Sequence, residues 1–594
     1  MVRVAVLNTD RCKPKECGLP CMNYCPQNRM RVNAIEFNPK EHEHPLIIEE
    51  MCPGCGICIK KCPFGALSIV NLPDELEEEC SHRYGVNAFK LYRLPIPTVG
   101  KLTGLIGRNG VGKTTSLRIL AGEIKPNLGN IENPPGWDEV SRRFRGSVLQ
   151  EYFQRLSKGD LRTVYKPQHV DAIPRAVSGI VGDVLDHVDE RGKKEWAIAT
   201  LQLRKVLDRE IGVLSGGELQ RVAIAAALLR DVDVYFFDEP SSYLDVFQRI
   251  NVARAIRSLI AEEKMVLVSE HDLAVLDYLS DHTCVLYGEP DVYGIVSHVH
   301  GVRVGINIYI EGFIPDENMR IRKKPITFHV KPPTKPAKFP VLLEWDEVSK
   351  SYDGFKLSIE AGRIGEGEVM GIVGPNGIGK TTFMKVLAGI EEPDEGMIRK
   401  GEMKMSYKPQ YLRVAYRGSV KSLLRKAAGR RFRTKKYKSE IIEPLNLQKA
   451  LEKDITELSG GELQRAAIAE CLSRDATVYL LDEPSAYLDV EERLAVAKAI
   501  RGITRTGGRA AFVVEHDIVA MDFIADRLMV FMGEPGLHGV ASSPVDLRDG
   551  MNRFLRDMEV TFRRDAETKR PRVNKEGSKL DRDQKSSGEY YYVG

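Results

Sequence analysis

Short uninterrupted apolar runs, rather than alternating ones, mark the buried strands of this chain. LTGLI (102–106) and VMGIV (369–373) each lead into a glycine-rich loop, and VYFFD (234–238) and VYLLD (478–482) each end in a carboxylate. Such runs are typical of strands that are covered on both faces in a parallel sheet. The pattern therefore predicts an α/β fold, with the carboxylates at the carboxyl edge of the sheet, where ligands bind.

The stretch from about residue 80 to residue 535 reads as one unit written twice. Five motifs recur in the same order, and the serine of LSGGELQR precedes the first aspartate of DEP by 23 residues in both copies. This shared register predicts two copies of one domain. The pairs are GRNGVGKTT (107–115) and GPNGIGKTT (374–382), YKPQ (165–168 and 407–410), LSGGELQR (214–221 and 458–465), VYFFDEPSSYLD (234–245) and VYLLDEPSAYLD (478–489), and SEHD (269–272) and VEHD (514–517).

The first motif of each copy is a phosphate-binding loop, or P-loop. A G-x-x-x-x-G-K-T sequence between a strand and a helix cradles phosphate with backbone N–H groups at the helix N-terminus. Lys113 and Lys380 are expected to reach the β- and γ-phosphates, and Thr114 and Thr381 are expected to ligate Mg²⁺. The predicted nucleotide-binding residues of the two loops are Gly107, Asn109, Gly110, Gly112, Lys113, Thr114 and Thr115, and Gly374, Asn376, Gly377, Gly379, Lys380, Thr381 and Thr382.

The acidic pair of each DEP motif supplies candidates for hydrolysis. Asp238 and Asp482 end the buried strands and are expected to bind the magnesium ion through water. Glu239 and Glu483 follow at a position where a general base can polarise the attacking water.

The LSGGELQR motif predicts a helix start with a capping box. Ser215 is followed three residues later by Glu218, and Ser459 by Glu462. Two glycines behind the capping serine expose N–H donors at the positive end of a helix, which suits a γ-phosphate. Because the P-loop already binds phosphate within its own domain, this second receptor suggests that each copy receives the nucleotide of the other.

These five motifs in this order resemble the ATP-binding-cassette superfamily. The resemblance implies two ATP molecules sandwiched head to tail. It also implies that an aromatic side chain upstream of each P-loop stacks on adenine. The candidates are Tyr84 or Phe89 in the first copy and Tyr352 or Phe355 in the second, although an aromatic residue at a strand end is often a core residue. The implied site one contains Lys113, Thr114, Gln168, Asp238, Glu239 and His271 opposite Ser459 and Gly461. The implied site two contains Lys380, Thr381, Gln410, Asp482, Glu483 and His516 opposite Ser215 and Gly217. In both sites the glutamine is a further magnesium ligand and the histidine is a catalytic residue by this resemblance.

Eight of the eleven cysteines lie within the first 62 residues. The second group, 52–62, has the C-x-x-C-x-x-C-x-x-x-C-P spacing of two-cluster ferredoxins, in which the fourth cysteine ligates the other cluster, and the first group, 12–25, is a looser version. Zinc and a disulfide framework are the alternatives, but zinc knuckles usually pair two C-x-x-C units and disulfides are typical of secreted chains. The pattern predicts a ferredoxin-like domain with two 4Fe-4S clusters, one on Cys12, Cys17, Cys21 and Cys62 and the other on Cys52, Cys55, Cys58 and Cys25.

The first copy contains an insertion that the second lacks. The P-loop lysine precedes the YKPQ glutamine by 55 residues in the first copy and by 30 in the second. Around Gly146, apolar residues recur at helical spacing and predict a helix-loop-helix with arginines outward. It is either a surface ornament or a docking element for an acidic partner such as RNA. The apolar residues are Trp137, Val140, Phe144, Val148, Leu149, Tyr152, Phe153 and Leu156, and the arginines are Arg142, Arg143, Arg145 and Arg155.

A second repeated segment follows each copy. GEPDVYG (288–294) matches GEPGLHG (533–539), and VRVGIN (302–307) matches LRDGMN (547–552), so the two segments are candidates to pack together as a hinge. KPPTKPAKFP (331–340) is expected to be a semi-rigid linker. Basic residues concentrate at 320–324, at 425–438 and from Arg563 onward, where solvated charged faces are the simplest interpretation.

The combination of a double-cluster module, two cassettes on one chain, an insertion only in the first cassette and paired hinge segments resembles the ribosome-recycling ATPase family, also called the RNase L inhibitor family. HRYGVNAF (82–89) and the tail from Asn574 extend the match over nearly the whole chain. The domains expected on this basis are an iron–sulfur domain (1–78), a first nucleotide-binding domain (79–290, with the insertion at about 137–162), a hinge segment and linker (291–339), a second nucleotide-binding domain (340–535), and a second hinge segment with the tail (536–594).

The family resemblance implies an ATPase that splits ribosomes into subunits after termination or rescue. Closure of the cassettes would move a rigid iron–sulfur domain, and the helix-loop-helix and hinge would hold the small subunit and its rRNA. A peptide release factor or its surveillance relative is an expected partner, with initiation factors as further candidates. The chain itself is expected to be a monomer whose two cassettes form an intramolecular dimer.

Bulk properties agree with this expectation. The chain has 594 residues, 43% hydrophobic and 29% charged, which indicates several domains of ordinary globular composition. No apolar run is long enough for a membrane span, and the N-terminus is unlike a signal peptide, so we expect a cytoplasmic location. An ATP-gated electron donor is the main alternative, but no G-x-G-x-x-G dinucleotide fingerprint is present. A transporter subunit and a chromosome-type ATPase fit less well, since there is neither a membrane part nor a long heptad coil.

Overall fold

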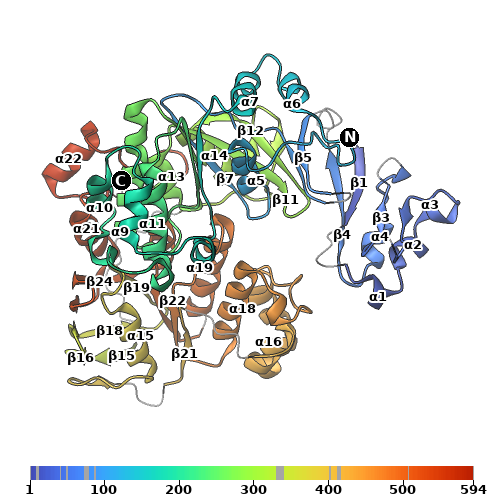
Figure 1. Cartoon of the computed structure of the whole chain (residues 1–594). Coiled ribbons are helices and arrows are strands. Elements are labelled where there is room, and N and C mark those ends of the chain that lie inside the picture. Colours follow the sequence, from blue (N-terminus) through green and yellow to red (C-terminus); the bar gives the residue numbers. More distant parts are fainter. Residues whose placement is uncertain are drawn as a thin grey trace.

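The structure is a computed structural model that describes residues 2–7, 12–40, 42–48, 51–72, 79–85, 88–328, 340–399, 403–410, 416–505 and 507–592. All but the last residue of the expected proline-rich linker, 331–340, lies outside the described residues. Figure 1 shows two large α/β bodies, with a small N-terminal body beside the first of them.

The first cassette is built on an eight-stranded sheet in the order β5-β6-β12-β11-β7-β10-β9-β8. Strands β11, β7, β10, β9 and β8 are parallel, and the P-loop strand β7 lies between β11 and β10. The strands are β5 (Cys80–Arg83), β6 (Lys90–Tyr92), β7 (Leu102–Gly107), β8 (Thr163–Lys166), β9 (Val234–Asp238), β10 (Met265–Ser269), β11 (His282–Glu289) and β12 (Tyr293–Gly301). The helices are α5 (Lys113–Leu120), α6 (Trp137–Arg143), α7 (Val148–Lys158), α8 (Ile173–Ala176), α9 (Val181–Val188), α10 (Lys194–Thr200), α11 (Gly216–Leu229), α12 (Val246–Arg257), α13 (Leu273–Leu279) and α14 (Val302–Glu311).

The second cassette repeats this sheet in the order β16-β17-β25-β24-β19-β23-β22-β21, with β15, β18 and β20 in a separate three-stranded sheet. Its strands are β15 (Val341–Trp345), β16 (Val348–Tyr352), β17 (Phe355–Ile359), β18 (Gly362–Gly365), β19 (Val369–Val373), β20 (Ile398–Arg399), β21 (Met405–Lys408), β22 (Val478–Asp482), β23 (Ala510–Val514), β24 (Arg527–Glu534), β25 (His538–Ala541) and β26 (Val545–Asp546). Its helices are α15 (Lys380–Ala388), α16 (Val420–Ala428), α17 (Lys435–Tyr437), α18 (Gly460–Ser473), α19 (Val490–Arg505) and α20 (Ile518–Ile524).

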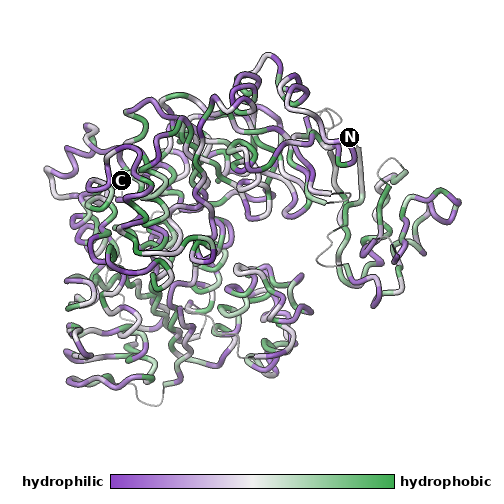
Figure 2. The backbone as a smooth tube through the Cα atoms, in the orientation of Figure 1, coloured by the Kyte–Doolittle hydropathy of each residue, from purple (hydrophilic) through white to green (hydrophobic). Residues whose placement is uncertain are grey.

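The four apolar runs that predicted parallel strands form β7, β9, β19 and β22, and every residue of β9 and β22 is buried. The hydrophobic stretches in Figure 2 follow the central strands of each cassette, while hydrophilic stretches gather at the periphery. The predicted α/β fold with two tandem P-loop domains is therefore confirmed.

Both cassette sheets extend past the expected domain ends at residues 290 and 535. Strand β12 pairs with β11 and β6, and β25 pairs with β24 and β17. The GEPDVYG and GEPGLHG segments are therefore the turns between paired strands of the cassettes rather than the beginnings of the hinge segments. Their last glycines reflect a close approach to the P-loop, because a Cβ at Gly294 or Gly539 would collide with the backbone of Val111 or Ile378.

The hinge segments proper begin at α14 and at α21 (Leu547–Asp557), and they contact each other as expected. Asn307 Nδ2 donates to Asp565 Oδ1 at 3.2 Å, and Arg303 Nε donates to Asp565 Oδ2 at 3.1 Å. The second segment also reaches the first cassette, where Arg572 donates two hydrogen bonds to the buried Asp277 of α13. The remaining hinge elements are β13 (Phe313–Ile314), β14 (Met319–Arg320), β27 (Phe562–Arg564), β28 (Pro571–Val573) and α22 (Lys579–Ser587).

The N-terminal body has a core of its own. Strand β1 (Val2–Leu7) pairs antiparallel with β4 (Leu67–Leu72), and the small apolar cluster beneath them includes cysteine side chains. This cluster is separate from the large core that runs through both cassettes and the hinge. The other elements are β2 (Ile35–Glu36), β3 (Leu46–Ile47), α1 (Pro14–Cys17), α2 (Pro20–Asn23), α3 (Pro26–Arg29) and α4 (Ile57–Lys61).

Candidate functional site

Each P-loop joins the central strand of its sheet to the first helix through a left-handed glycine. Gly112 and Gly379 have φ values of 96° and 100°, and a Cβ at Gly112 would lie 2.8 Å from the ring of Phe89. Glycine is therefore required at this point of the turn. The next residue begins the helix, so the backbone N–H groups of its first turn are free to bind an anion.

The P-loop lysines lie buried within their own loops. Lys113 Nζ donates to the carbonyl oxygens of Gly107 and Arg108 at 2.9 and 2.8 Å, and Lys380 Nζ donates to those of Gly374 and Pro375 at 2.8 and 2.6 Å. Burial lowers the pKa of both lysines, although nearby carboxylates oppose the shift. A triphosphate would supply the negative charge that such a buried ammonium group needs.

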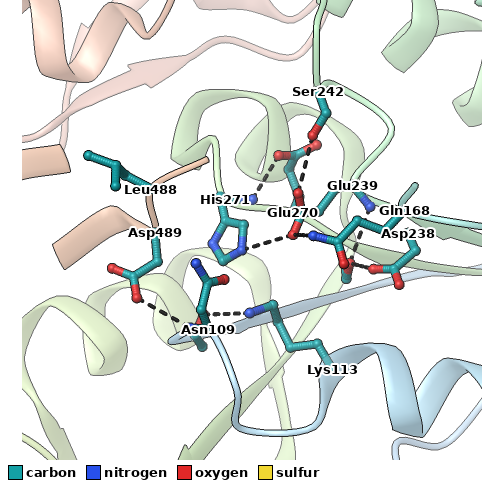
Figure 3. A network of polar contacts seen from close by, with 12 residues as sticks. Asn109, Lys113, Gln168, Asp238, Glu239, Ser242, Glu270, His271, Leu488 and Asp489 are labelled. Carbon is teal, nitrogen blue, oxygen red and sulfur yellow. Dashed lines mark hydrogen bonds and ion pairs between the residues drawn. The ribbon is translucent and has the colours of Figure 1, made fainter. Parts of the chain in front are cut away.

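The candidate catalytic glutamates are each held by two polar side chains of their own cassette. Gln168 Nε2 donates to Glu239 Oε1 at 2.8 Å, and His271 Nε2 lies 3.2 Å from the same oxygen (Figure 3). Ser242 Oγ donates to the other carboxylate oxygen at 3.1 Å. The structure thus brings together residues from β9 and from the segments after β8 and β10, which are far apart in the sequence.

The second cassette repeats the glutamine and histidine contacts, but Ala486 stands where the first cassette has Ser242. Gln410 Nε2 donates to Glu483 Oε1 at 2.6 Å, and His516 Nε2 lies 3.3 Å from that oxygen. Burial opposes ionisation of Glu483, but His516 and Lys380 outweigh it and lower the pKa of this carboxyl group to about 2. The carboxylate is therefore ionised at neutral pH and can accept a proton or orient a water molecule.

Both glutamates sit in a strained backbone conformation that other residues hold in place. Their φ values are 44° and 47°, in the left-handed region that non-glycine residues rarely adopt. Gln220 Nε2 donates to the carbonyl oxygen of Glu239 at 2.9 Å, and Gln464 Nε2 donates to that of Glu483 at 2.8 Å. These two buried glutamines belong to the LSGGELQR helices α11 and α18, so each signature helix is tied to the glutamate of its own cassette.

The buried lysines of the YKPQ motifs make further hydrogen bonds to the backbone of the DEP motifs. Lys166 Nζ donates to the carbonyl oxygen of Asp238 at 3.0 Å, and Lys408 Nζ donates to that of Asp482 at 2.8 Å. Burial lowers the pKa of each lysine to about 8. The sequence analysis did not assign a role to these lysines or to Gln220 and Gln464, although their recurrence inside the repeated motifs was a signal that pointed to them.

The two aspartates that precede the glutamates have different surroundings. Asp238 accepts hydrogen bonds from Tyr165, at 3.0 Å, and from Ser269. Asp482 accepts one from Thr381 Oγ1 at 2.7 Å, and no side chain of the described residues donates to its Oδ1 atom, because Val514 stands where the first cassette has Ser269. Burial raises the pKa of Asp482.

The predicted capping boxes are confirmed in both LSGGELQR motifs. Ser215 N donates to Glu218 Oε2 at 2.9 Å, and Glu218 N donates back to Ser215 Oγ. Ser459 and Glu462 make the same reciprocal pair at the start of α18. The serine and the two glycines are thereby fixed at the positive end of each helix, with the N–H groups of the glycines available.

Both P-loops and the Ser-Gly-Gly turns of both LSGGELQR motifs, here called the signature turns, border one cleft of about 2900 Å³ between the cassettes. Asn109 and Gly110 of the first loop, Lys380 and Thr381 of the second, and the Ser-Gly-Gly turns at 215–217 and 459–461 all line it. Residues of the N-terminal body, from Cys62 to Ile69, line the same cleft.

Two aspartates that the sequence analysis did not select join the cassettes across this cleft. Asn109 N donates to Asp489 Oδ2 at 3.2 Å (Figure 3), and Asn376 N donates to Asp245 Oδ2 at 2.7 Å. Each aspartate ends the repeated DEP motif of one cassette and binds the P-loop of the other. The signal that could have identified them is their fixed place, seven residues after the first aspartate of DEP in both copies.

The aromatic candidates lie next to the P-loops. Phe89 and Phe355 pack against the left-handed glycines Gly112 and Gly379. Tyr84 and Tyr352 are 50% and 44% exposed, and the Tyr84 hydroxyl lies 3.2 Å from Thr115 Oγ1. All four side chains are therefore close enough to contact a bound nucleotide, and which of them stacks on adenine stays a prediction.

The eight N-terminal cysteines form two neighbouring groups of free thiols. Burial raises the pKa of Cys12 to about 12, with further contributions from Cys21, Cys17 and Cys62. Burial raises the pKa of Cys58 to about 11, with contributions from Cys52 and Cys55. For Cys12 these neighbours are the other members of its predicted ligand set, whereas for Cys58 they are two members of its set together with Cys21 of the other set.

The thiol chemistry fits an iron–sulfur cluster better than the two alternatives. Thiolates packed this closely require positive charge to be ionised, and a metal cluster supplies it. Among the described residues, no three or more histidine, cysteine or acidic side chains are placed to hold one metal ion. A cubane cluster keeps its ligand sulfurs farther apart because four irons lie between them. The free thiols likewise disfavour a disulfide framework.

The predicted helix-loop-helix is present as α6 and α7, which pack on each other through Phe144 and Phe153. Arg142, Arg143 and Arg145 are exposed. Val148, which the periodicity placed on the apolar face, is instead 59% exposed, because it occupies the first turn of α7 beside the connecting loop.

Comparison with known proteins gives matches over the whole chain. A family model described as "ABC transporter" matches residues 98–242 and 360–486, a "4Fe-4S binding domain" model matches 45–68, and a "possible Fer4-like domain in RNase L inhibitor" matches 2–33. An uncharacterized ABC transporter ATP-binding protein of Methanocaldococcus jannaschii is 54% identical, covering 100% of this chain and 98% of its own length. Translation initiation factor RLI1 of Chaetomium thermophilum is 46% identical, covering 100% and 98%.

Solved structures match equally well. A structure described as ribosome-bound archaeal Pelota and ABCE1 has a TM-score of 0.93 at 54% identity and covers 100% of this chain and 99% of the other. A complex of the archaeal ribosomal stalk protein aP1 with an archaeal ribosome recycling factor has a TM-score of 0.84 at 55% identity and covers 87% of this chain and 100% of the other. Among the described residues, no helix is long and apolar enough to cross a membrane.

Proposed function

The chain belongs to the RNase L inhibitor family, the E family of ATP-binding-cassette proteins, and from this premise we propose that it splits ribosomes into subunits by ATP-driven closure of its cassettes. The family carries ATPase cassettes and iron–sulfur domains. The observation that carries the proposal is the shared cleft, which both P-loops, both signature turns and the segment Cys62–Ile69 line together. Closing this cleft on two nucleotides would displace the N-terminal body.

Two composite ATP sites follow from the positions of the motifs. Lys113 and Thr114, behind the cleft-lining Asn109 and Gly110 of the first P-loop, would bind a nucleotide opposite Ser459 and Gly461. Lys380 and Thr381 would bind one opposite Ser215 and Gly217. Mg²⁺ would be held by the two threonines with Gln168 and Gln410, and through water by Asp238 and Asp482. The magnesium ion would neutralise phosphate charge, while this chain's own groups orient the water.

Glu239 and Glu483 are the proposed general bases. Each is ionised and close to a histidine and a glutamine, so an attacking water can be held by three groups of known position. The two carboxylates are 16% and 19% exposed and line the cleft, so an attacking water molecule can reach them.

We propose that the N-terminal body binds two 4Fe-4S clusters. Cys12, Cys17, Cys21 and Cys62 would hold one, and Cys52, Cys55, Cys58 and Cys25 the other. With a small apolar core of its own, this body depends on bound clusters for rigidity. The clusters thus serve a mechanical role, and the alternative of an ATP-gated electron donor has no structural observation in its favour.

The proposed partners are the ribosomal small subunit with its rRNA and a release factor or its surveillance relative. The relatives' names support this set, because one solved relative is bound to the ribosome with Pelota and another to a ribosomal stalk protein. The exposed arginines of α6 and the hinge elements α14 and α21 would hold the small subunit through phosphates. We infer a cytoplasmic monomer.

Subunit splitting tests the function directly. Ribosomes carrying a release factor, the chain and ATP should separate into subunits on a sucrose gradient. Replacing Cys58 with serine should abolish splitting while basal ATP turnover persists, because the cassettes do not contain that residue. Intact 70S or 80S particles with the unmodified chain would contradict the proposal, and turnover that responds to a reductant and acceptor instead of ribosomes would favour electron transfer.

A further inference from the structure

One surface of the second cassette is strongly basic and has no counterpart in the first. The 22 residues from Gly418 to Ser439 contain nine Lys or Arg and no Asp or Glu, a net charge of +9. They form α16, the short helical turn Gly429–Arg433, α17 and the start of the next turn. We call this segment the basic surface; α16 lies at the lower right of Figure 1, at the edge of the molecule.

The equivalent segment of the first cassette has the opposite charge. An isolated bridge pairs Ser419 with Asp454 at the start of α16, and a matching bridge pairs Ile180 with Glu210 at the start of α9, which aligns the two helices. The 22 residues 179–200 contain three Lys or Arg and five Asp or Glu, a net charge of −2. The difference is therefore not imposed by the fold, because both segments occupy the same place.

The cations of the two segments also differ in their partners. All three in the first cassette are paired, Arg191 and Lys193 with Glu262 and Lys194 with Asp186. In the basic surface only Lys421 and Lys436 make ion pairs with described residues. The six that are exposed and make no ion pair with any described residue are Arg425, Lys426, Arg430, Arg433, Lys435 and Lys438.

The folded core beneath the surface does not depend on these cations. The buried side chains of the segment are apolar or aromatic, including Val420, Leu424 and Tyr437, and α16 packs against α18 through them. Self-repulsion among nine like charges costs stability, and within the described residues few acidic groups offset it. Such a concentration of unpaired charge fits a surface that is neutralised by a partner.

We infer that the basic surface binds the phosphate backbone of RNA, as a contact that the second cassette makes on the same nucleic acid the proposed function requires. This inference rests on the proposed function for the identity of the polyanion. Four of the nine cations are arginines, whose planar guanidinium groups bind phosphate with two parallel hydrogen bonds. A membrane is a poorer match, because no large apolar side chain of 418–439 is exposed to enter the lipid.

RNA binding would have a definite salt dependence. Each phosphate that a protein cation neutralises contributes about 0.9 to the slope of log affinity against log salt concentration. Removing three cations that contact phosphate should therefore lower that slope by about 2 to 3 units. Removing three that are already paired within the protein should leave it unchanged.

The experiment uses the full chain and a fluorescent RNA duplex of mixed sequence, with anisotropy measured across a salt series. The test variant carries Arg430→Ala, Arg433→Ala and Lys435→Ala, and the matched control carries Arg191→Ala, Lys193→Ala and Lys194→Ala at the equivalent place in the first cassette. We expect the test variant to lose at least tenfold in affinity at the lowest salt and to show the smaller slope, while the control retains the slope of the unmodified chain. Basal ATP turnover and thermal unfolding of both variants verify that the fold is retained.

Other outcomes overturn the inference. An unchanged salt slope in the test variant, or an equal fall of the slope in the control, would show that the basic surface does not bind RNA. Anisotropy of labelled polyglutamate and co-sedimentation with phosphatidylserine vesicles are measured in parallel, and a larger loss on either of them assigns the surface to an acidic protein or a membrane. Because the duplex assay contains no ribosomes, failure of ribosome splitting would contradict the proposed function and leave this result standing.

Discussion

The two cassettes share the glutamine and histidine contacts to their glutamates but hold their aspartates differently, and Ser242 adds a contact to Glu239 that Ala486 cannot give to Glu483. Glu239 and Glu483 each contact a glutamine and a histidine of their own cassette at nearly equal distances. A tyrosine lies beside each aspartate, Tyr165 and Tyr407, but Asp238 is also held by Ser269, whereas Asp482 is held by Thr381 of its own P-loop. In the second site, Thr381, a proposed magnesium ligand, thus donates a hydrogen bond to Asp482. The groups proposed to orient water are common to both cassettes, and the surroundings of the two aspartates set the cassettes apart.

The largest loss of ATP turnover should come from changing the glutamates, which both cassettes have. Glu239→Gln and Glu483→Gln each remove a general base while keeping the size of the side chain and one acceptor oxygen. We expect each to reduce turnover at its own site by about a hundredfold or more, with ATP binding retained. Single-turnover hydrolysis and filter binding of labelled ATP measure the two effects.

Equal loss from both changes would support two equivalent bases. If neither variant loses turnover, the assignment of these glutamates as bases is wrong.

The next effect concerns two equivalent aspartates under the hinge. Asp277 of α13 is 1% exposed and pairs with Arg570 and Arg572, and Asp522 of α20 pairs with Arg564 and Tyr591. Asp277→Ala would take the ion-pair partner from the buried Arg570 and leave Arg572 with Asp565 alone, and should lower the free energy of unfolding by about 3 to 5 kcal/mol. Urea denaturation followed by circular dichroism measures it.

Asp522→Ala should cost less than Asp277→Ala, because it releases only one arginine. The reverse order would show that the hinge depends more on the second cassette than the ion pairs indicate.

A smaller effect should follow from cutting the tie between a signature helix and its glutamate. Gln220→Leu removes the hydrogen bond to the carbonyl oxygen of Glu239, and Gln464→Leu removes the matching one in the second cassette. The strained turn then loses about 1 to 3 kcal/mol of support, so we expect turnover to fall about tenfold with little change in ATP affinity. Steady-state kinetics separates kcat from KM.

Tyr235→Phe is the matched control for Gln220→Leu. It removes a side-chain hydrogen bond to the backbone carbonyl of Arg230 from the same strand, β9, away from the carboxyl edge. If this change lowers turnover as much as Gln220→Leu does, the role of Gln220 is general stability.

The smallest effect tests the difference between the aspartates. Ser269→Val should remove one hydrogen bond from Asp238, and Val514→Ser should add one to Asp482. Each bond contributes about 1 kcal/mol, so we expect opposite shifts of about fivefold in the Mg²⁺ concentration that half-saturates nucleotide binding. Fluorescent-nucleotide titration in the Glu→Gln background of the other site provides the readout, and shifts in the same direction would contradict it.

Much of the site could be predicted because its chemistry is local. The N–H cradle of a P-loop, the capping boxes at Ser215 and Ser459 and the spacing of the cysteines each depend on residues a few positions apart. The strands could be predicted because continuous apolar runs need cover on both faces. The domain ends were harder, since β12 and β25 are recognisable only by the strands with which they pair.

The amino-acid sequence by itself determined the chemical groups, their order and the duplication of one domain. Only the tertiary structure decided which groups meet: Asp489 at the P-loop of Asn109, Gln220 at the strained turn of Glu239, and Cys62 on the wall of the shared cleft. The physical reason is that local motifs are fixed by backbone geometry over a few residues. Contacts between residues hundreds of positions apart depend on how two separate sheets and a hinge pack together, and no short sequence pattern encodes that packing.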